Sequence, residues 1–300
     1  MSRTRWTAAS SSGTPLVRSE LHTFFCLILA LCCACCPPLL AAQAATAPLL
    51  RIDSGSHSAP IRALAVDAAG RYAVTAAEDK TARVWDLGDG RLLQTLRPPA
   101  GSGNDGKLFA AAITANGALI AVGGWSADND VYLFERASGR LLQRITGLPN
   151  IITHLSFSPD GKLLLVSLWG KHGVRLFEGN SDWQKLREAD SDSSYQGDSY
   201  AASFSADASR LVTTSQDGLV RLYDVRDQRL KLLQSVRPVA AAAAFGVAFA
   251  PDGKHIALSF SDRQAVLVLD ARTLQTAYLP SLTGIDNGSL TALAWSADGR

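Results

Sequence analysis

A short pattern returns six times along this chain, and its spacing constrains the fold more than any other feature of the sequence. Each copy carries a turn after an apolar run, and most continue into a second such run, as in FSPDGKLLLV and FAPDGKHIAL. The turn position is expected at Gly70, Gly117, Gly161, Ser209, Gly253 and Gly299, with spacings of 47, 44, 48, 44 and 46 residues. A self-similar period of this length indicates a repeat architecture.

Each repeat is expected to form four short strands. In the third repeat these strands are predicted at residues 152–158, 163–169, 173–179 and 183–189. The turn at residues 159–161 has the sequence Pro-Asp-Gly, in which proline presets the backbone, aspartate bonds back to the main chain and glycine accepts a positive φ. Four-stranded units at this period are typical of propeller blades, so the sequence predicts an all-β fold, a β-propeller of four-stranded blades.

Five complete blades are expected, followed by a sixth that stops after its first turn. The five span about residues 51–97, 106–147, 150–190, 199–237 and 245–280, and the sixth begins at Leu290. Closing a propeller removes free sheet edges, whereas an incomplete propeller exposes them. We therefore expect residues 48–300 to be an incomplete propeller, a fragment with seven blades in its full form, and to be poorly soluble or to self-associate when expressed alone.

The first 47 residues predict an export signal. Basic residues precede the apolar run FFCLILALCCACC at residues 24–36, and small residues follow, with cleavage expected after Ala44 or Ala47. This order is that of a secretory signal peptide. A retained N-terminal anchor is the alternative, although Pro37 and Pro38 break the helix that an anchor requires. The protein is therefore expected in the periplasm or secreted, or else anchored in the membrane and facing outward.

At TARVWDLGDG, residues 81–90, the sequence resembles the WD-repeat propellers, and the resemblance extends from about residue 51 to residue 300. It implies a buried hydrogen-bonded set that ties the first blade together, made by His57, Thr75, Asp79 and Trp85. The 28-residue separation of His57 and Trp85 suits the family pattern. The resemblance implies that this set is a structural staple, and a catalytic relay is the disfavoured alternative.

The other blades depart from the family pattern. The fourth keeps Thr213 and Asp217 but has Tyr223 in place of tryptophan, and the second, third and fifth have no matching histidine. These blades are expected to be held mainly by apolar packing. The export signal and the segments VDAAG and GIDNGSL also resemble bacterial exported WD-repeat proteins in which a caspase-like peptidase sometimes follows the propeller, although this sequence contains no residue of such a domain.

Composition argues against several functions. All five cysteines lie within residues 26–36, so the rest of the chain has no thiol for a disulfide, a metal site or a nucleophile. Beyond that segment the chain has 26 basic and 26 acidic residues, a balance that gives no support to nucleic-acid binding. The Asp-rich stretch 190–199 lacks the glycine and the final acid of a calcium loop, so it is expected to be a solvated loop between blades. We expect no catalytic residue, no cofactor and no metal ion, and membrane contact only through an uncleaved N-terminal segment.

A binding surface remains as the expected functional site. In a propeller, the loops between second and third strands lie on the same face as the loops between blades. Trp125 and Trp169 follow the second strands of two neighbouring blades, so they are expected side by side on this rim, as anchors for a ligand or each packed under its own loop. Weaker candidates on the same rim are Asp128, His172, Tyr195, Tyr200 and Arg263.

These features together favour a non-catalytic scaffold that binds a protein or peptide. The alternative is the N-terminal recruiting or sensing half of a longer exported hydrolase, such as a caspase-like peptidase.

Overall fold

The computed structural model describes residues 55–180, 183–240, 242–285 and 288–299. All described residues belong to one compact unit, residues 53–300. The predicted signal peptide or anchor at residues 1–47 lies outside the described residues. Across the described ranges, the structure contains no helix with the length and apolar character that crossing a membrane requires.

The described residues form five four-stranded antiparallel sheets, in which neighbouring strands follow chain order. The first sheet holds β1 (Ile61–Val66), β2 (Tyr72–Ala77), β3 (Ala82–Asp86) and β4 (Leu92–Leu96). The second holds β5 (Lys107–Ile113), β6 (Leu119–Trp125), β7 (Val131–Glu135) and β8 (Leu141–Ile145). The third holds β9 (Ile152–Phe157), β10 (Leu163–Leu168), β11 (Val174–Gly179) and β12 (Leu186–Asp192). The fourth holds β13 (Ser199–Phe204), β14 (Arg210–Ser215), β15 (Val220–Asp224) and β16 (Lys231–Val236). The fifth holds β17 (Ala244–Phe249), β18 (His255–Phe260), β19 (Val266–Asp270) and β20 (Thr276–Tyr278). The predicted all-β class and the four-stranded repeat are confirmed, and the sheets are consistent with propeller blades.

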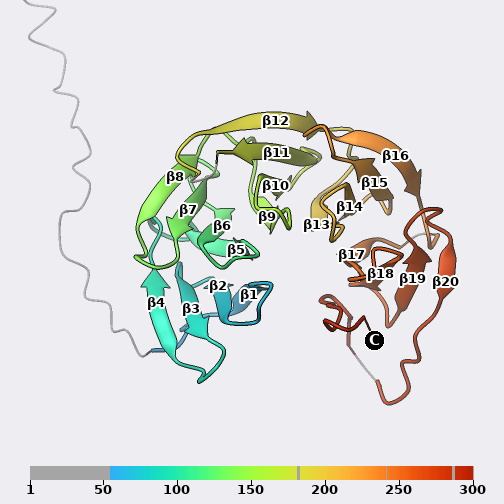
Figure 1. Ribbon diagram of the computed structural model, residues 1–300, viewed down its shortest axis with the longest axis horizontal. Coiled ribbons are helices and arrows are strands. Elements are labelled where there is room, and N and C mark those ends of the chain that lie inside the picture. Colours follow the sequence, from blue (N-terminus) through green and yellow to red (C-terminus); the bar gives the residue numbers. More distant parts are fainter. Residues whose placement is uncertain (1–54, 181–182, 241, 286–287, 300) are drawn as a thin grey trace, which may run out of the picture. The chain divides into compact units, whose positions relative to one another are not determined.

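Within residues 53–300 the five sheets follow one another around a common centre (Figure 1). The first strand of each sheet, β1, β5, β9, β13 or β17, lies nearest that centre, and the fourth strand lies outermost. Four apolar clusters fill the spaces between neighbouring sheets, and each cluster draws its side chains from two consecutive sheets. Val74 with Ile120, and Leu164 with Leu133, are fully buried examples. The core is thus a series of layers between blades, as stacking of repeats requires.

The hairpin turns between first and second strands have the left-handed residue that the sequence predicts, with one correction. Gly70, Gly117, Gly161 and Gly253 have φ between 65° and 71°. In the fourth sheet the left-handed residue is Ala208, with φ of 56°, and not Ser209 as expected. The Asp207 carboxylate accepts a hydrogen bond from the Ser209 backbone N–H at 3.0 Å, a local bond that fixes this turn without glycine.

The third sheet departs from prediction in its outer strand. The fourth strand begins at Leu186, three residues later than expected, and continues through Asp192. Trp183, expected to begin the strand, has a left-handed backbone with φ of 57°, and its indole packs at right angles to the Phe157 ring. A left-handed residue cannot lie within a strand, so pairing starts beyond it. The predicted loop at residues 190–199 is therefore wrong in its first three residues, which complete β12, and in Ser199, which begins β13.

Residues 288–299 pack on the fifth sheet where a further inner strand would lie. The Leu290 N–H donates to the Phe260 carbonyl at 3.1 Å, and the Trp295 indole donates to the Ala248 carbonyl at 3.1 Å. The segment contains no strand, because an antiparallel ladder needs a neighbouring strand and none of the described residues supplies one. Of the predicted sixth repeat, the structure therefore shows a segment packed on the fifth sheet and a turn at residues 296–299.

The innermost strand of the first sheet has an uncovered face. Leu64 is 66% exposed and Val66 is 46% exposed, whereas the corresponding strands of later sheets are largely buried. This face lies at the β1 end of the series of sheets (Figure 1). The expected self-association of an incomplete propeller stays a prediction.

Candidate functional site

The set predicted for the first blade is assembled from two strands of one sheet, the segment before β1 and the turn between β2 and β3. His57 precedes β1, Thr75 lies in β2, Asp79 lies in the following turn and Trp85 lies in β3. The His57 ring bonds Asp79 Oδ2 through Nδ1 at 2.9 Å and Thr75 Oγ1 through Nε2 at 2.8 Å. The Trp85 indole N–H donates to the same Thr75 oxygen at 2.9 Å. A continuous chain of hydrogen bonds therefore crosses the sheet from its inner loop to β3.

Burial limits what this first-blade set can do. The side chains of His57 and Asp79 are 4% and 7% exposed, so no substrate atom reaches them. Burial alone would raise the pKa of the Asp79 carboxyl, but hydrogen bonds from Thr81, His57 and the Ser58 N–H outweigh it and hold that pKa below its usual range. A carboxylate whose oxygens are already occupied by such donors is suited to a structural tie.

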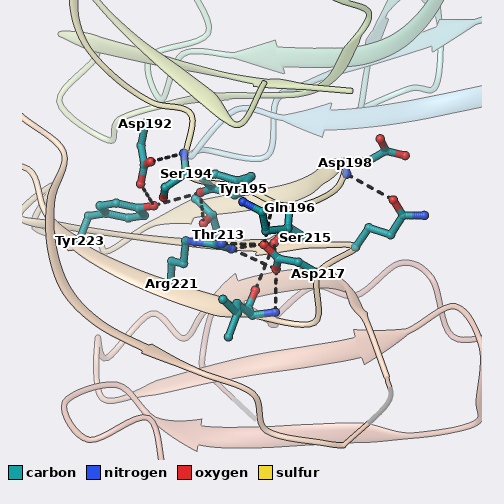
Figure 2. Close-up of polar contacts among 12 residues, drawn as sticks. Asp192, Ser194, Tyr195, Gln196, Asp198, Thr213, Ser215, Asp217, Arg221 and Tyr223 are labelled. Carbon is teal, nitrogen blue, oxygen red and sulfur yellow. Dashed lines mark hydrogen bonds and ion pairs between the residues drawn. The ribbon is translucent and has the colours of Figure 1, made fainter. Parts of the chain in front are cut away.

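The fourth blade contains a second set that sequence reasoning missed (Figure 2). The Tyr195 hydroxyl lies 2.6 Å from Thr213 Oγ1 and 3.1 Å from the Tyr223 hydroxyl, and Tyr223 donates to Asp192 Oδ2 at 2.7 Å. Tyr195 is 1% exposed, so its prediction as a rim residue is wrong. Apolar clusters lie on both faces of the fourth sheet, as expected, and the polar set adds to this packing.

A sequence signal for this second set did exist. Thr213, Asp217 and Tyr223 follow Tyr195 by 18, 22 and 28 residues, the separations at which Thr75, Asp79 and Trp85 follow His57. A tyrosine hydroxyl can both donate and accept, so it can replace the histidine ring at this position. A search for a histidine at this position does not find the second set.

Arg221 completes the fourth-blade set. Its guanidinium lies 2.6 Å from Asp217 Oδ2 and 4.0 Å from the Tyr195 ring centre, in a cation–π arrangement. Burial raises the pKa of Tyr195 to about 12, and it also raises the pKa of Tyr223. Burial opposes ionisation of Asp217, but hydrogen bonds from Arg221 and Ser215 lower the pKa of that carboxyl well below its usual range. All these groups keep one protonation state through neutral pH, as a structural tie requires.

The two rim tryptophans meet on the face formed by the loops after the second strands. The ring centroids of Trp125 and Trp169 lie 6.4 Å apart with an interplanar angle of 84°. Trp125 is 39% exposed and Trp169 is 38% exposed, whereas Trp183 is 2% exposed. The pair is thus an edge-to-face aromatic contact open to solvent, and it is not folded under the loops.

The weaker rim candidates fall into different surroundings. Asp128 accepts a hydrogen bond from Arg144 at 2.9 Å, and Arg144 also pairs with the buried Asp130. Arg263 pairs with the neighbouring Asp262 at 3.1 Å. His172 is partly exposed in the loop between β10 and β11. The Tyr200 ring packs on Phe245 with centroids 4.7 Å apart.

The innermost strand of every sheet carries a one-residue irregularity near the same face. The ladder between first and second strands skips one residue in each sheet: Arg62, Phe109, Thr153, Tyr200 and Phe245. A β-bulge of this kind re-aims the extra side chain and is frequent beside binding sites. Sequence reasoning identified Tyr200 alone among these five residues. The others were missed because the bulge is a property of pairing and not of the alternation pattern.

A cavity of about 460 Å³ lies at the opposite ends of the fourth and fifth sheets. Its lining includes Asp207, Arg210, Asp224, Arg226 and Asp252. Arg226 pairs with Asp224, and Arg210 donates to the Ala271 carbonyl at 3.1 Å. Within the described residues no group of three or more His, Cys, Asp or Glu side chains could hold a metal ion.

Comparison with known proteins matches two stretches of the chain to a family model. Residues 49–86 and 193–224 match the model described as WD domain, G-beta repeat. The first stretch contains all of the first hydrogen-bonded set, and the second contains all of the second set except Asp192. The family match and the hydrogen-bonded sets thus fall in the same two blades.

Three curated proteins illustrate the relatives. A pre-mRNA-processing factor 19 homolog 2 from Arabidopsis thaliana is 26% identical over 246 residues, 76% of this chain and 41% of that protein. An uncharacterized WD repeat-containing protein from Synechocystis is 25% identical over 142 residues, 47% of this chain and 38% of that protein. The small ribosomal subunit protein RACK1 from Caenorhabditis elegans is 27% identical over 156 residues, 51% of this chain and 46% of that protein. The chain thus spans less than half the length of these relatives, and together the matches support a WD-repeat family.

Proposed function

We propose, from the support for a WD-repeat family, that this chain is a non-catalytic scaffold that binds a protein or peptide on the face carrying Trp125 and Trp169. WD-repeat proteins are typically protein-interaction scaffolds. The observation that carries the proposal is the solvent-open contact between the two indoles. Tryptophan is enriched among the residues that dominate binding energy at interfaces, because it buries a large area with few rotatable bonds.

The loops that hold the tryptophans are fixed before any ligand arrives. The Ala127 N–H donates to Asp105 at 2.9 Å, beside Trp125. The Gly170 N–H donates to Asp198 at 2.7 Å, beside Trp169. A preorganised surface loses less conformational entropy on binding, so more of the contact energy becomes affinity.

Selection from a random peptide library tests this function. The full chain is panned against displayed dodecamers, and each selected peptide is then measured against Trp125→Ala, Trp169→Ala and Tyr278→Ala variants. We expect binding that weakens at least about tenfold in each tryptophan variant, as for an interface hot spot. Tyr278 is a matched control, since it is an aromatic residue 46% exposed on the outer strand β20. Peptides that lose affinity in the control variant instead, or that bind all variants equally, would contradict the proposal.

We also propose that the protein is exported, with the N-terminal segment removed near Ala44 or Ala47. The support is the order of basic residues, apolar run and small residues at the start of the chain. Mass spectrometry of protein recovered from the producing cells checks this, with a mature mass that excludes residues 24–36 as the expected result. A mass that retains those residues would favour an anchor facing outward.

The alternative role, as the recruiting half of an exported hydrolase of caspase-like type, rests on resemblance alone. Sequencing the gene beyond the codon for residue 300 distinguishes the two roles, since a Cys/His domain there would support the hydrolase.

A further inference from the structure

Each blade offers two equivalent positions to the rim, always 16 residues apart. One is the bulged residue of the innermost strand, and the other is the residue that ends the second strand or directly follows it. The five pairs are Arg62 with Glu78, Phe109 with Trp125, Thr153 with Trp169, Tyr200 with Gln216, and Phe245 with Ser261. The repeat thus brings ten side chains to comparable places around the centre of the sheets.

Aromatic residues occupy half of these ten positions, whereas they make up 7% of the chain. The aromatic fraction at these positions is far above that of the whole chain, so these positions differ from an average surface. We name the five aromatic members, Phe109, Trp125, Trp169, Tyr200 and Phe245, the aromatic crescent. All five lie on the second to fifth sheets, which are consecutive in Figure 1.

Two ring contacts, one loop hydrogen bond and the register of β5 and β6 place the members of the aromatic crescent near one another in order. Phe109 lies beside the end of β6, because its neighbour Leu108 pairs with Gly124. Trp125 then meets Trp169, and the Trp169 loop is tied to the Tyr200 loop by the bond from Gly170 to Asp198. Tyr200 in turn packs on Phe245. The members therefore form one surface.

The aromatic crescent also holds unused hydrogen-bond donors. Of the five tryptophans in the described residues, Trp85, Trp183 and Trp295 donate their indole N–H to oxygens of the protein. The indole N–H groups of Trp125 and Trp169 have no partner among the described residues, and neither does the Tyr200 hydroxyl. A ligand that supplies acceptor oxygens would satisfy all three groups.

Most carboxylates around the aromatic crescent already have donors: the Asp198 carboxylate accepts the Gly170 N–H at 2.7 Å. Glu78 accepts hydrogen bonds from Arg62 at 2.6 Å and from Lys107 at 2.9 Å. Asp128 pairs with Arg144, and Asp262 pairs with Arg263. Few carboxylates are left to accept peptide N–H groups or to attract a basic ligand. Lys171, in the Trp169 loop, is an exposed cation without an ion pair among the described residues, so it adds a further donor to this surface. The surface therefore fits a neutral ligand that is rich in acceptors and poor in donors.

We propose, resting on the function proposed above, that the aromatic crescent binds an extended proline-rich segment of a protein in the polyproline II conformation. Such a segment has no internal hydrogen bonds, so its carbonyl oxygens are free to accept from the two indoles. Its proline rings present apolar faces to the aromatic side chains, and proline lacks the N–H that this surface cannot satisfy. Aromatic-lined surfaces recognise such segments because their conformation is formed before binding.

Fluorescence anisotropy with a labelled decaproline peptide tests the proposal on the full chain. We expect decaproline to bind and a labelled Gly-Ser decamer of the same length not to bind. Trp125→Phe and Trp169→Phe keep an aromatic face but remove the N–H, so each should weaken binding about three- to tenfold, the value of one hydrogen bond. Tyr200→Phe should weaken it less than Tyr200→Ala, and Tyr278→Ala should leave it unchanged.

The outcomes separate this inference from the proposed function. Library peptides that require Trp125 and Trp169 but contain little proline, together with no binding of decaproline, would overturn the inference and leave the function standing. Decaproline affinity unchanged in both Trp→Phe variants would also overturn it. Absence of any peptide binding would overturn both. Circular dichroism melting of each variant shows whether it is folded, and the Phe variants keep the test valid if an Ala variant is not.

Discussion

At the scale of single residues, two blades use different chemistry for the same structural purpose. In the first blade a histidine ring bridges Asp79 and Thr75. In the fourth a tyrosine hydroxyl bridges Thr213 and Tyr223, and a cation–π contact with Arg221 supplies the link to Asp217. The requirement is therefore a buried group that can bond to two elements at once, and histidine is one of several solutions.

The first-blade set predicts a large effect of Asp79→Ala. The change removes the acceptor of the exposed Ser58 N–H and of the part-buried His57 and Thr81 donors, and these two are left unsatisfied. The loss should be about 1 to 3 kcal/mol, and each kcal/mol lowers the melting temperature by about 2 to 4 °C in a domain of this size. Thermal melting checks it against Arg263→Ala, which removes a solvent-screened surface ion pair and should shift the melting temperature far less. Equal melting shifts would count against the structural role of this set.

The fourth-blade set predicts a contrast between two tyrosines. Tyr195→Phe removes a hydroxyl that bonds Thr213 and Tyr223 in a buried site, and should lower stability by about 1 to 3 kcal/mol. Tyr200→Phe removes a hydroxyl without a partner among the described residues, and should change stability by less than about 0.5 kcal/mol. Urea unfolding of both variants measures the contrast. A Tyr195→Phe protein as stable as the Tyr200→Phe protein would refute the second set.

At the scale of elements, alternation and turn residues in the sequence predict strands and hairpin turns. Features that depend on how two strands pair, such as bulges, cannot be predicted in this way. The third strand of the third sheet, Val174–Gly179, follows from alternation and lies within one residue of the predicted range 173–179. The start of β12 could not be predicted, because the left-handed backbone of Trp183 depends on its contact with Phe157. The bulges at the rim share this origin, since they exist only in the register between two strands.

One bulge supplies a prediction about Gly124. A Cβ atom at this position would lie 2.2 Å from the Lys107 carbonyl oxygen and 2.7 Å from the Phe109 nitrogen, both backbone atoms. Gly124→Ala should therefore shift the β5–β6 pairing and lower stability by about 1 to 3 kcal/mol. Gly88→Ala is the control, because its Cβ would meet only the Asp86 side chain, at 3.1 Å. Melting curves compare the two, and a harmless Gly124→Ala would contradict the close approach.

At the scale of the whole propeller unit, stability depends on contacts between neighbouring sheets. His154 in β9 bonds the Ala202 carbonyl in β13 through Nε2 at 3.0 Å, and Phe249 N–H in β17 donates to Ser203 Oγ in β13 at 3.0 Å. Polar bridges of this kind add to the four apolar layers. Because each sheet is held mainly by the next, loss of one contact should weaken the adjoining blades together.

His154 makes stability depend on pH in a defined window. Burial lowers the pKa of its ring to about 4 in the folded chain, from the usual 6.5 of an exposed histidine. Between these pH values the unfolded chain binds a proton that the folded chain does not. The free energy of unfolding is therefore highest above pH 6.5 and falls as pH drops towards 4. The full loss should be at most about 3 kcal/mol. Urea unfolding from pH 7 to pH 4 should show that the free energy of unfolding declines. The decline should disappear in His154→Gln and remain in the control variant His255→Gln. A decline that persists in His154→Gln would assign it to another group.

Hydrogen–deuterium exchange with a library-selected peptide tests the central claim, recognition by the rim, most directly. Exchange of the full chain is compared with and without saturating peptide. The account predicts slower exchange on binding at residues 124–130, 169–173 and 196–200, around the aromatic crescent, with residues 205–210 and 251–253 at the opposite edge unchanged. Protection confined to residues 205–210 and 251–253, or none at residues 124–130 and 169–173, would contradict it.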